Sequence, residues 1–434
     1  MRRGRPPTWH GPARRRERAV AGILVIGGGI GGLTLALCLH RQGIPCTVLE
    51  AAAEIRPLGV GVNILPHAAA ELARLGLAEE LQRLGVAPAE ARFFNRFGQH
   101  VHAEPLGRAA GYDHPQLSLH RADLHGALLA AVRERLGEGA VRLDHRVARV
   151  EQDEQGVTVV FTPGRGGAMP PPLRGSVAIG ADGIHSALRR QLYPAEGEPK
   201  YTGYNMWRGV TRWPPFLGGA AMTRAGWLKT GKMVLYPIRD HADGTQLLNW
   251  VFEVETETHR SRRDWNRPGE VEDILPWVRD WAFDWLDVPA MLRASEVVLE
   301  FPMVDQDPLP RWTFGRVTLL GDAAHPMVPR GSNGAGQSIL DARCLADLLA
   351  RHGEDAEAAL RAYEAVRLPA TTQVVLTNRT NPPDAILREV FLRTSDRPFG
   401  RIEEVMSREE MLAITGGYKR VAGYDLATLQ AHRG

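Results

Sequence analysis

The chain has 434 residues, more than one hydrophobic core usually supports, and its 44% hydrophobic and 24% charged residues are typical of a soluble globular protein. The net charge of +3 arises in the first 20 residues, which hold seven arginines and one glutamate, so the rest of the chain carries −3. This distribution argues against a basic nucleic-acid-binding stripe on the body of the protein, and residues 1–20 are predicted to be a basic disordered extension.

A strand, a glycine-rich turn, a helix and a second strand are predicted between Gly22 and Glu50. The turn fits the pattern G-x-G-x-x-G, and its residues are Gly27, Gly29, Ile30, Gly31 and Gly32. Such glycines let the backbone approach a pyrophosphate at a helix N-terminus, while a carboxylate about 20 residues on, here Glu50, accepts hydrogen bonds from a ribose. The pattern predicts a bound dinucleotide, NAD or FAD, over the alternative of a glycine-rich turn in an ordinary α/β domain.

Two helices are predicted in the next part of the chain, Pro66–Leu75 and a later one that ends at Gly137. Gly61 precedes the first helix and suits either a backbone pressed against a flat ligand or a tight turn. Between the helices, residues 92–118 are expected to be an irregular excursion from the first domain.

Strands are then predicted at Val141–Val150, Val157–Thr162 and Ser176–Gly180. Residues 201–303 contain several further strand-like runs and a single predicted helix near residues 271–281. Eight of the ten tryptophans fall between Trp207 and Trp285, which predicts a mostly antiparallel sheet with an aromatic surface.

An α/β pattern returns at residue 315, with a strand at 316–320 that ends in Gly321 and Asp322, and a helix that starts near Gly334. Asp322 would lie at the carboxyl end of its strand, where it can bind a sugar or ribityl hydroxyl. The start of the helix would favour negative charge on a neighbouring ring. An Asx turn followed by a helix cap is the alternative. Further helices are predicted at 354–380, 384–394 and 408–414.

Other features set limits on the protein's location and ligands. No run of about 18 apolar residues occurs, so no membrane span is predicted, and the first apolar run already forms the dinucleotide-binding strand. The odd and unclustered cysteines Cys38, Cys46 and Cys344 are interpreted as apolar fillers in a reduced, cytoplasmic protein. No metal site is predicted.

Three motifs together resemble the single-component FAD-dependent aromatic hydroxylases, the family of para-hydroxybenzoate and salicylate hydroxylases. They are the glycine-rich turn with Glu50, residues 180–183 with His185 and Ser186, and Gly321-Asp322 with the helix start that follows. The resemblance covers nearly the whole chain after residue 20 and implies FAD in the first site. Residues 204–210, 249–251, 330–335 and 418–423 look most like the branch that contains the phenazine-pathway hydroxylase.

The resemblance also implies roles for individual residues. Arg121 would contact the bound FAD, and Asp182 is linked to the pyrophosphate of FAD and to use of NAD(P)H. The helix start at Gly334, Ala335 and Gly336 would lie beside N1 and O2 of the flavin, with Pro329 beside its reactive C4a position. His325 is interpreted as a packed or hydrogen-bonded structural histidine rather than a base.

A substrate is expected between the flavin and the inserted sheet. Candidate contacts are Tyr204, Arg208, Tyr236 and Trp250, and strand alternation must place some of them on the inner face and others on the outer face. Arg208 stands out because a guanidinium can hold a carboxylate with two hydrogen bonds.

The implied reaction uses NADH or NADPH as a transient reductant of FAD. Dioxygen would then add at flavin C4a, and the hydroperoxide would transfer one oxygen atom to a small aromatic or heteroaromatic substrate, with loss of CO2 where a carboxylate occupies the attacked carbon. A flavin oxidase or dehydrogenase on the same fold and a non-catalytic flavoprotein that binds an aromatic ligand are the alternatives. A monomer or homodimer is expected.

These expectations give an α/β fold. A Rossmann-type FAD-binding domain with a parallel sheet is interrupted by a mostly antiparallel substrate-binding sheet domain and followed by C-terminal helices. The FAD-binding domain is assigned residues 21–92, 118–197 and 312–372, the substrate domain residues 93–117 and 198–311, and the C-terminal helical segment residues 373–434.

Overall fold

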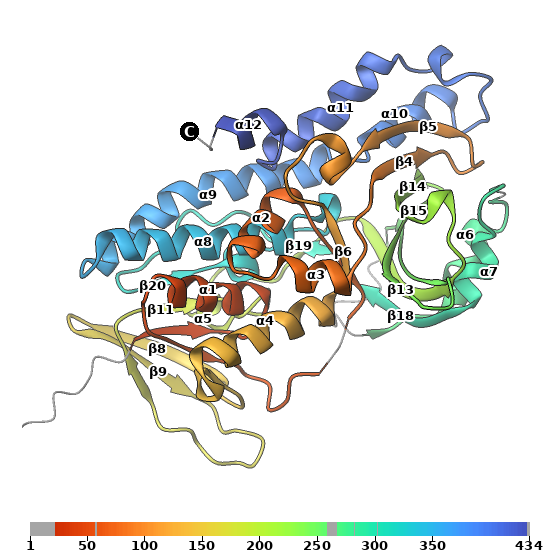
Figure 1. The fold of residues 1–434 in the computed structure, drawn as a ribbon. Coiled ribbons are helices and arrows are strands. Elements are labelled where there is room, and N and C mark those ends of the chain that lie inside the picture. Colours follow the sequence, from red (N-terminus) through yellow and green to blue (C-terminus); the bar gives the residue numbers. More distant parts are fainter. Residues whose placement is uncertain (1–21, 57–58, 258–266, 282, 302, 432–434) are drawn as a thin grey trace, which may run out of the picture.

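A computed structural model describes residues 22–56, 59–257, 267–281, 283–301 and 303–431, so the predicted extension at 1–20 lies outside the described residues. Its first layer is a parallel sheet in the order β20-β11-β1-β2-β7 (Figure 1). The strands are β1 (Ile23–Ile26), β2 (Cys46–Leu49), β7 (Val141–Arg142), β11 (Ala178–Gly180) and β20 (Val317–Leu319). The predicted α/β fold is confirmed, and the first strand–turn–helix unit stands at the centre of this sheet.

Three helices pack against one another beside the parallel sheet. They are α1 (Ile30–Arg41), α4 (Arg121–Leu136) and α8 (Gly334–His352), with α1 between the other two. The long apolar runs of β1 and α1 are almost fully buried, which joins sheet and helices in one core. Because α1 and α8 both begin at the carboxyl ends of sheet strands, their N-termini lie at the ligand-binding edge of the sheet.

The predicted strand 141–150 is divided in two. Its first residues form β7 in the parallel sheet, whereas β8 (Val147–Asp153) joins β9 (Gly156–Phe161) and β10 (Leu173–Gly175) in a separate antiparallel sheet. Asp144 lies between them with φ 58°, a left-handed conformation that ends the first strand. Helix α5 (Ala187–Leu192) packs on β8. Alternation alone did not reveal this break in the strand.

A second region is an eight-stranded sheet in the order β17-β18-β13-β16-β15-β14-β4-β5, seen to the right in Figure 1. Its strands are β4 (Glu90–Phe94), β5 (His100–Pro105), β13 (Tyr204–Trp213), β14 (Ala221–Trp227), β15 (Gly231–Asp240), β16 (Gln246–Glu255), β17 (Arg267–Pro268) and β18 (Ser295–Phe301). All neighbours are antiparallel except β14 and β4. The mostly antiparallel sheet was therefore predicted correctly.

The prediction that residues 92–118 are irregular was wrong. Strands β4 and β5 form a hairpin there, and Asn95 shapes its turn because the Asn95 side chain accepts hydrogen bonds from the backbone N–H groups of Phe97 and Gln99. A further strand, β6 (Leu117–His120), pairs with β3 (Gly61–Ile64). The short strands of this segment were hidden because polar and aromatic residues alternate irregularly along them.

The described tryptophans of this region do not gather into an exposed aromatic surface. Trp207, Trp250 and Trp281 are buried in a core between the eight-stranded sheet and two short helices, α6 (Leu275–Val278) and α7 (Val288–Arg293). The single helix predicted at 271–281 is shorter in the structure, where it is α6, and α7 was not predicted. Large rings on the outer face of this sheet are covered because the two helices pack across them.

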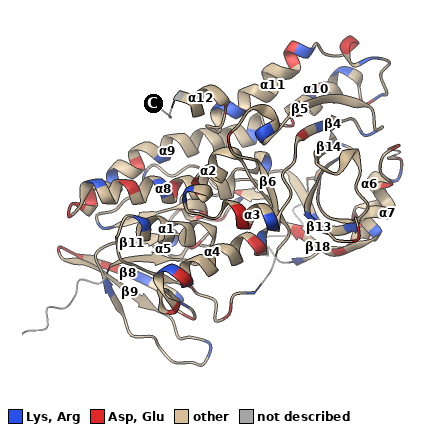
Figure 2. Cartoon of the chain, in the orientation of Figure 1, with Lys and Arg blue, Asp and Glu red and all other residues tan. Residues whose placement is uncertain are grey.

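Further helices are α2 (Pro66–Arg74), α3 (Ala78–Leu84), α9 (Ala356–Thr380), α10 (Ala385–Thr394), α11 (Arg408–Val421) and α12 (Leu426–Ala431), and β12 (Lys200–Tyr201) pairs with β19 (Val304–Asp305). Helix α10 packs on β14, and α11 packs on α9 and α10, so the C-terminal helices connect the two sheet regions (Figure 1). Within the described ranges, no helix has both the length and the apolar character required to cross a membrane. Figure 2 shows acidic and basic residues side by side on the outer helices.

Candidate functional site: a cavity between two sheets

A cavity of about 570 Å³ extends from the glycine-rich turn to the inner face of the eight-stranded sheet. Of the predicted cofactor and catalytic residues, those that line it are Gly29, Ile30, Gly31, Gly61, Arg121, Asp182, Gly321, Asp322, Pro329, Gly334 and Ala335. They come from regions as far apart in the sequence as residues 29 and 335. The structure thus brings most of the predicted site together around one cavity.

The glycine-rich turn is shaped for a ligand with a close approach to the backbone. A Cβ atom on Gly32 would lie 2.0 Å from the carbonyl oxygen of Gly27, and one on Gly27, which has φ +106°, would lie 2.3 Å from that of Ala181. Neither position accepts a side chain without movement of the backbone. A Cβ atom on Gly29 would instead meet no atom within 4 Å, so Gly29 borders open space.

Glu50 stands behind this turn rather than among the residues that line the cavity. Its Oε2 atom accepts a hydrogen bond of 2.8 Å from the backbone N–H of Gly28, and Oε1 accepts one of 2.7 Å from that of Ala52. Gly27, Gly32 and Gly336 are also absent from the lining, and Gly336 lies next to His67 and Ala68. These predicted residues shape the site without bordering the cavity.

Two opposite charges, Arg121 and Asp322, line the cavity, and both residues are exposed to its open space. Partial removal from bulk water lowers the pKa of Arg121 and raises that of Asp322, and the attraction between the two charges opposes both shifts. Arg121 is held at the start of α4, where its backbone N–H donates to the carbonyl oxygen of Val60. The pair is placed to hold polar groups of a ligand between them.

Asp182 offers an acceptor without a partner. Its Oδ2 atom accepts a hydrogen bond of 2.7 Å from the backbone N–H of Ala187, whereas its buried Oδ1 atom has no hydrogen-bond partner in the described part of the chain. Burial raises the pKa of this carboxyl group. A buried acceptor of this kind indicates that a ligand completes its hydrogen bonding.

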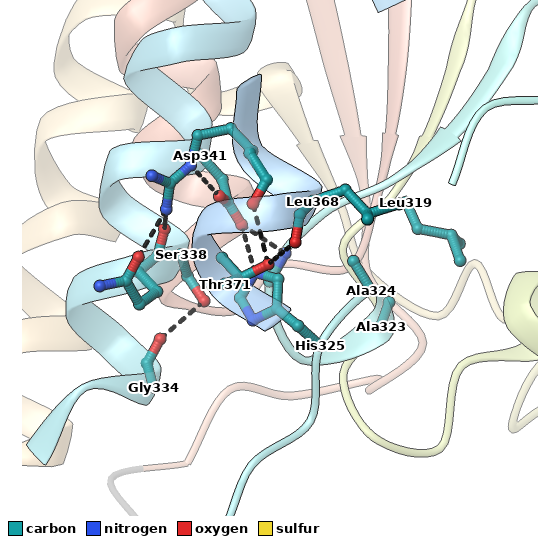
Figure 3. A network of polar contacts seen from close by, with 12 residues as sticks. Leu319, Ala323, Ala324, His325, Gly334, Ser338, Asp341, Leu368 and Thr371 are labelled. Carbon is teal, nitrogen blue, oxygen red and sulfur yellow. Dashed lines mark hydrogen bonds and ion pairs between the residues drawn. The ribbon is translucent and has the colours of Figure 1, made fainter. Parts of the chain in front are cut away.

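The loop that follows β20 is anchored by Asp341 of α8 (Figure 3). Its Oδ2 atom lies 2.6 Å from Nε2 of His325 and accepts a hydrogen bond from the backbone N–H of Gly321, while Oδ1 accepts one of 2.7 Å from Nε of Arg367. His325 is buried and hydrogen-bonded, as predicted for a structural histidine. This network fixes the strand end that carries Asp322.

The loop that carries Pro329 is held from the other side by the C-terminal helix α11. The hydroxyl group of Tyr418 accepts a hydrogen bond of 2.7 Å from Asn333 Nδ2 and donates one of 2.6 Å to Asn378 Oδ1. A Cβ atom on Gly331 would lie 1.9 Å from that hydroxyl oxygen, so the loop and Tyr418 are in close contact. Helix α8 begins directly after this loop, and its first residues Gly334 and Ala335 face the cavity.

The inner face of the eight-stranded sheet forms the other end of the cavity. Arg208 and Tyr236, two of the candidate substrate contacts, line it. Arg208 donates a hydrogen bond of 2.7 Å to the carbonyl oxygen of Gly61, and its guanidinium lies 5.0 Å from the ring centre of Phe301. Tyr204 is packed behind the lining, with the guanidinium of Arg330 4.2 Å from its ring centre.

Trp250 does not belong to the cavity, and this prediction is corrected. Its neighbour Val251 faces the cavity, so strand alternation turns Trp250 to the opposite face, where it is fully buried. Its Nε1 atom donates hydrogen bonds to Thr211 Oγ1 and Ser295 Oγ. Trp250 therefore supports the sheet from outside.

Sequence reasoning missed a group of charged residues on the inner face. Arg224, Lys232 and Glu253 come from β14, β15 and β16, and Arg330 and Asp384 approach from outside the sheet. Lys232 forms buried ion pairs with both Glu253 and Asp384, and Nε of Arg330 lies 3.7 Å from Glu253 Oε1. Lys232 and Glu253 are directly opposite each other in the β15–β16 register. A single charge within each of these apolar strands was the sequence signal that could have revealed the pair.

Together these features fit FAD. The open space at Gly29, the Asp182 Oδ1 atom, which has no partner among the described residues, and the residues Arg121 and Asp322 lie along one cavity that also borders the N-terminus of α8. The dinucleotide would be held along this path by the turn, by Asp182 and by Arg121, with its ring system at the start of α8, where backbone N–H groups favour negative charge.

Comparison with known proteins gives the same answer. The family model described as "FAD binding domain" matches residues 21–378. The chain is 43% identical, over 92% of its length and 96% of the relative, to phenazine 1,6-dicarboxylic acid hydroxylase PhzS of Lysobacter antibioticus. It is 37% identical, over 81% of its length and 85% of the relative, to 3-amino-4-hydroxybenzoate 2-monooxygenase PtnB3 of Streptomyces platensis.

Solved structures show the same arrangement. Klebsiella pneumoniae HpxO in complex with FAD and uric acid superposes with a TM-score of 0.76 at 26% identity, covering 93% of this chain and 97% of that one. A salicylate hydroxylase substrate complex gives 0.71 at 25% identity, covering 95% and 98%. The chain therefore belongs to the FAD-binding-domain family of flavoproteins and, within it, to the single-component FAD-dependent aromatic hydroxylases.

Proposed function

We propose that this protein hydroxylates an acidic aromatic or heteroaromatic molecule, with NADH or NADPH as reductant and O2 as oxidant. One atom of O2 enters the ring and the other leaves as water, and NAD(P)H supplies the two electrons. One observation carries the proposal: the start of α8 and the sheet face with Arg208 line the same cavity. We call this part of the cavity the junction.

Each part of this junction has a task that needs no acid–base triad. The redox chemistry comes from FAD when bound. The N-terminus of α8 at Gly334 and Ala335 would stabilise negative charge on the flavin, and Pro329 borders the same part of the cavity. Arg208 orients a carboxylate of the substrate so that its ring lies on the apolar residues of the sheet face.

Similarity to other enzymes agrees with an acidic substrate. The relatives include a phenazine dicarboxylic acid hydroxylase and several hydroxybenzoate hydroxylases. The substrate in each of these names is an aromatic ring with at least one carboxyl group. We therefore place the substrate of this protein among aromatic and N-heteroaromatic carboxylates.

The test is NAD(P)H oxidation by the purified FAD-loaded protein with a panel of phenols, aryl carboxylates and N-heteroaromatic carboxylates, with product masses recorded. A product that has gained one oxygen atom, or that carries hydroxyl in place of carboxyl, establishes hydroxylation and shows whether CO2 is lost. Faster oxidation that yields only hydrogen peroxide marks an effector. Substrate oxidation that reduces O2 without any NAD(P)H would contradict the proposal and favour an oxidase.

A further inference from the structure

Two arginine side chains remain uncompensated in the substrate half of the cavity. Six charged residues line this half: Arg208, Arg224, Lys232, Glu253, Arg330 and Asp384. Lys232 and Arg330 are balanced by Glu253 and Asp384, with which they form one connected group of ion pairs. Arg208 and Arg224 form no ion pair with any described residue, which leaves two positive charges in excess.

Asp384, one of the two acids of the balanced group, is held as an anion by the cations around it. Burial acts to raise the pKa of Asp384, but the charges of Lys232, Arg330 and Arg224 outweigh it and hold that pKa below its usual value. Asp384 is therefore an anion at neutral pH and stays committed to Lys232. The two acids of this group carry two negative charges against the four positive charges of this half of the cavity, so Arg208 and Arg224 leave an excess of two even though the charge of Arg224 also acts on Asp384.

The two arginines stand in one row across the sheet. In the strand registers, Arg208 pairs with Val251, Val251 pairs with Val234, and Val234 pairs with Arg224. All four side chains line the cavity. The Cα atoms of the two arginines are separated by three strand spacings, about 14 Å, and the two valines lie between them.

This row has the form of a platform with a cation at each end. Branched apolar side chains in its middle favour contact with a flat ring, and each guanidinium can hold a carboxylate with two hydrogen bonds. Phe301 lies beside Arg208 and Phe93 beside Arg224, at 5.0 and 5.3 Å from ring centre to guanidinium carbon. Neither guanidinium group has a hydrogen-bonded anion among the residues that the structure describes.

We infer that the substrate carries two acidic groups, one bound by Arg208 and the other by Arg224, with its planar ring system lying on Val234 and Val251. This inference rests on the proposed function, because it names the substrate class of the same cavity. The net charge of +2 on the platform matches a dianion. The relative named as a phenazine 1,6-dicarboxylic acid hydroxylase has a substrate with two carboxyl groups, as the platform requires.

Equilibrium binding to the FAD-loaded protein tests the inference, with the change in flavin absorbance as the signal. The probes are phenazine-1,6-dicarboxylate, phenazine-1-carboxylate and phenazine, and the comparison is repeated with a naphthalene dicarboxylate and its monocarboxylate. The variants are Arg224→Met, which removes the charge and retains length, and Arg224→Lys, which retains the charge. Arg212→Met is the matched control, because Arg212 lies on the same sheet but is exposed and paired with Asp243.

The wild-type protein should bind a diacid at least about tenfold more tightly than the monoacid of the same ring, as expected for one extra charged hydrogen-bonded contact. Arg224→Met should raise the Kd of the diacid by about tenfold to a hundredfold and leave the Kd of the monoacid within about threefold. Arg224→Lys should keep part of the preference, and Arg212→Met should keep all of it. FAD content per chain shows that each variant is folded.

The inference is overturned if the wild-type protein does not prefer the diacid in either ring system, or if Arg224→Met weakens diacid and monoacid equally. Product analysis separates this result from the fate of the proposed function. A diacid that binds with the expected selectivity but is never hydroxylated supports the two-anion platform and contradicts the proposed function. If a monoacid is hydroxylated and the protein shows no preference for the diacid, the proposed function is supported and the two-anion platform is contradicted.

Discussion

Nε2 of His325 lies 2.6 Å from Oδ2 of Asp341, and this contact joins the loop after β20 to helix α8. The other carboxylate oxygen of Asp341 binds Arg367 of α9, so one buried acid connects three elements (Figure 3). Burial acts to raise the pKa of Asp341, but the charges of His325 and Arg367 and their hydrogen bonds hold it below its usual value. Asp341 is a structural anion that sets the position of the flavin-facing loop.

Replacement of this acid should be costly. Asp341→Asn leaves Arg367 buried without its anion, and the free energy of unfolding should fall by about 3–5 kcal/mol. Denaturation in urea measures the loss. Asp347→Asn is the matched control on the same helix, since Asp347 pairs with the half-exposed Arg343 and should cost at most about 1 kcal/mol. Equal losses in the two variants would contradict the anchoring role of Asp341.

Two glycines of the first turn should respond differently to alanine. Gly32→Ala places a methyl group 2.0 Å from the backbone oxygen of Gly27, so the folded protein should be destabilised and FAD lost together. Gly29→Ala meets no protein atom within 4 Å, so the stability of the FAD-free protein should change by less than about 1 kcal/mol.

The informative measurement for Gly29→Ala is FAD affinity. Because the added methyl group would stand in the open space that borders the turn, we expect the Kd for FAD to rise at least about tenfold, measured by flavin fluorescence on reconstitution. Unchanged affinity in Gly29→Ala would mean that the pyrophosphate does not approach the backbone at this residue.

The buried ion-pair group beside the substrate platform makes a separate stability prediction. Lys232→Met leaves Glu253 and Asp384 buried without their shared cation and should lower the free energy of unfolding by about 3–5 kcal/mol. Lys200→Met removes a lysine that pairs with Asp307 at the surface, so it should cost at most about 1 kcal/mol. Thermal unfolding of the two variants side by side provides the comparison, and a mild effect of Lys232→Met would show that water reaches the group.

His67 should make the protein sensitive to mild acid. Burial, with a smaller contribution from Arg367, lowers the pKa of His67 to about 3, and neither of its ring nitrogens has a hydrogen-bond partner in the described part of the chain. The unfolded chain binds a proton at this residue below about pH 6.5, whereas the folded protein does not. Stability is therefore present above that pH and is lost as the pH falls from about 6.5 toward 3.

The expected slope from this one residue is about 1.4 kcal/mol per pH unit within that window. His67→Phe keeps a ring against Tyr424, with which His67 stacks at 5.5 Å, and should flatten the dependence between pH 6 and 4 by about that amount. His352→Gln, at an exposed position near the end of α8, serves as the control. Urea unfolding at several pH values measures the slope, and an identical slope in wild type and His67→Phe would exclude His67 as its source.

Local patterns in the sequence were sufficient for the cofactor half of the protein. The turn from Gly27 to Gly32, the acid at Glu50 and the strand end at Asp322 each belong to a short run of strand, turn or helix whose residue types are recognisable locally, although Gly27 also makes a distant contact with Ala181. Helices α9 and α10 could be predicted for the same reason, because helical periodicity is local, whereas α11 continues to Val421, beyond its predicted end at 414, and α12 was not predicted. Arg121 and Asp182 were assigned by resemblance, and the structure places both at the cavity.

The substrate half was decided by tertiary structure. Alternation placed Trp250 and Val251 on opposite faces but could not say which face is inner, and α6 and α7 settle this by covering the face of Trp250. Asp384 contacts Lys232, which is 152 residues away in the sequence. Arg208 of β13 and Arg224 of β14 share a row only through the register of β16 and β15, the two strands between them. Charge compensation and register between distant strands are long-range properties, so only the assembled sheet reveals which arginines remain for a ligand.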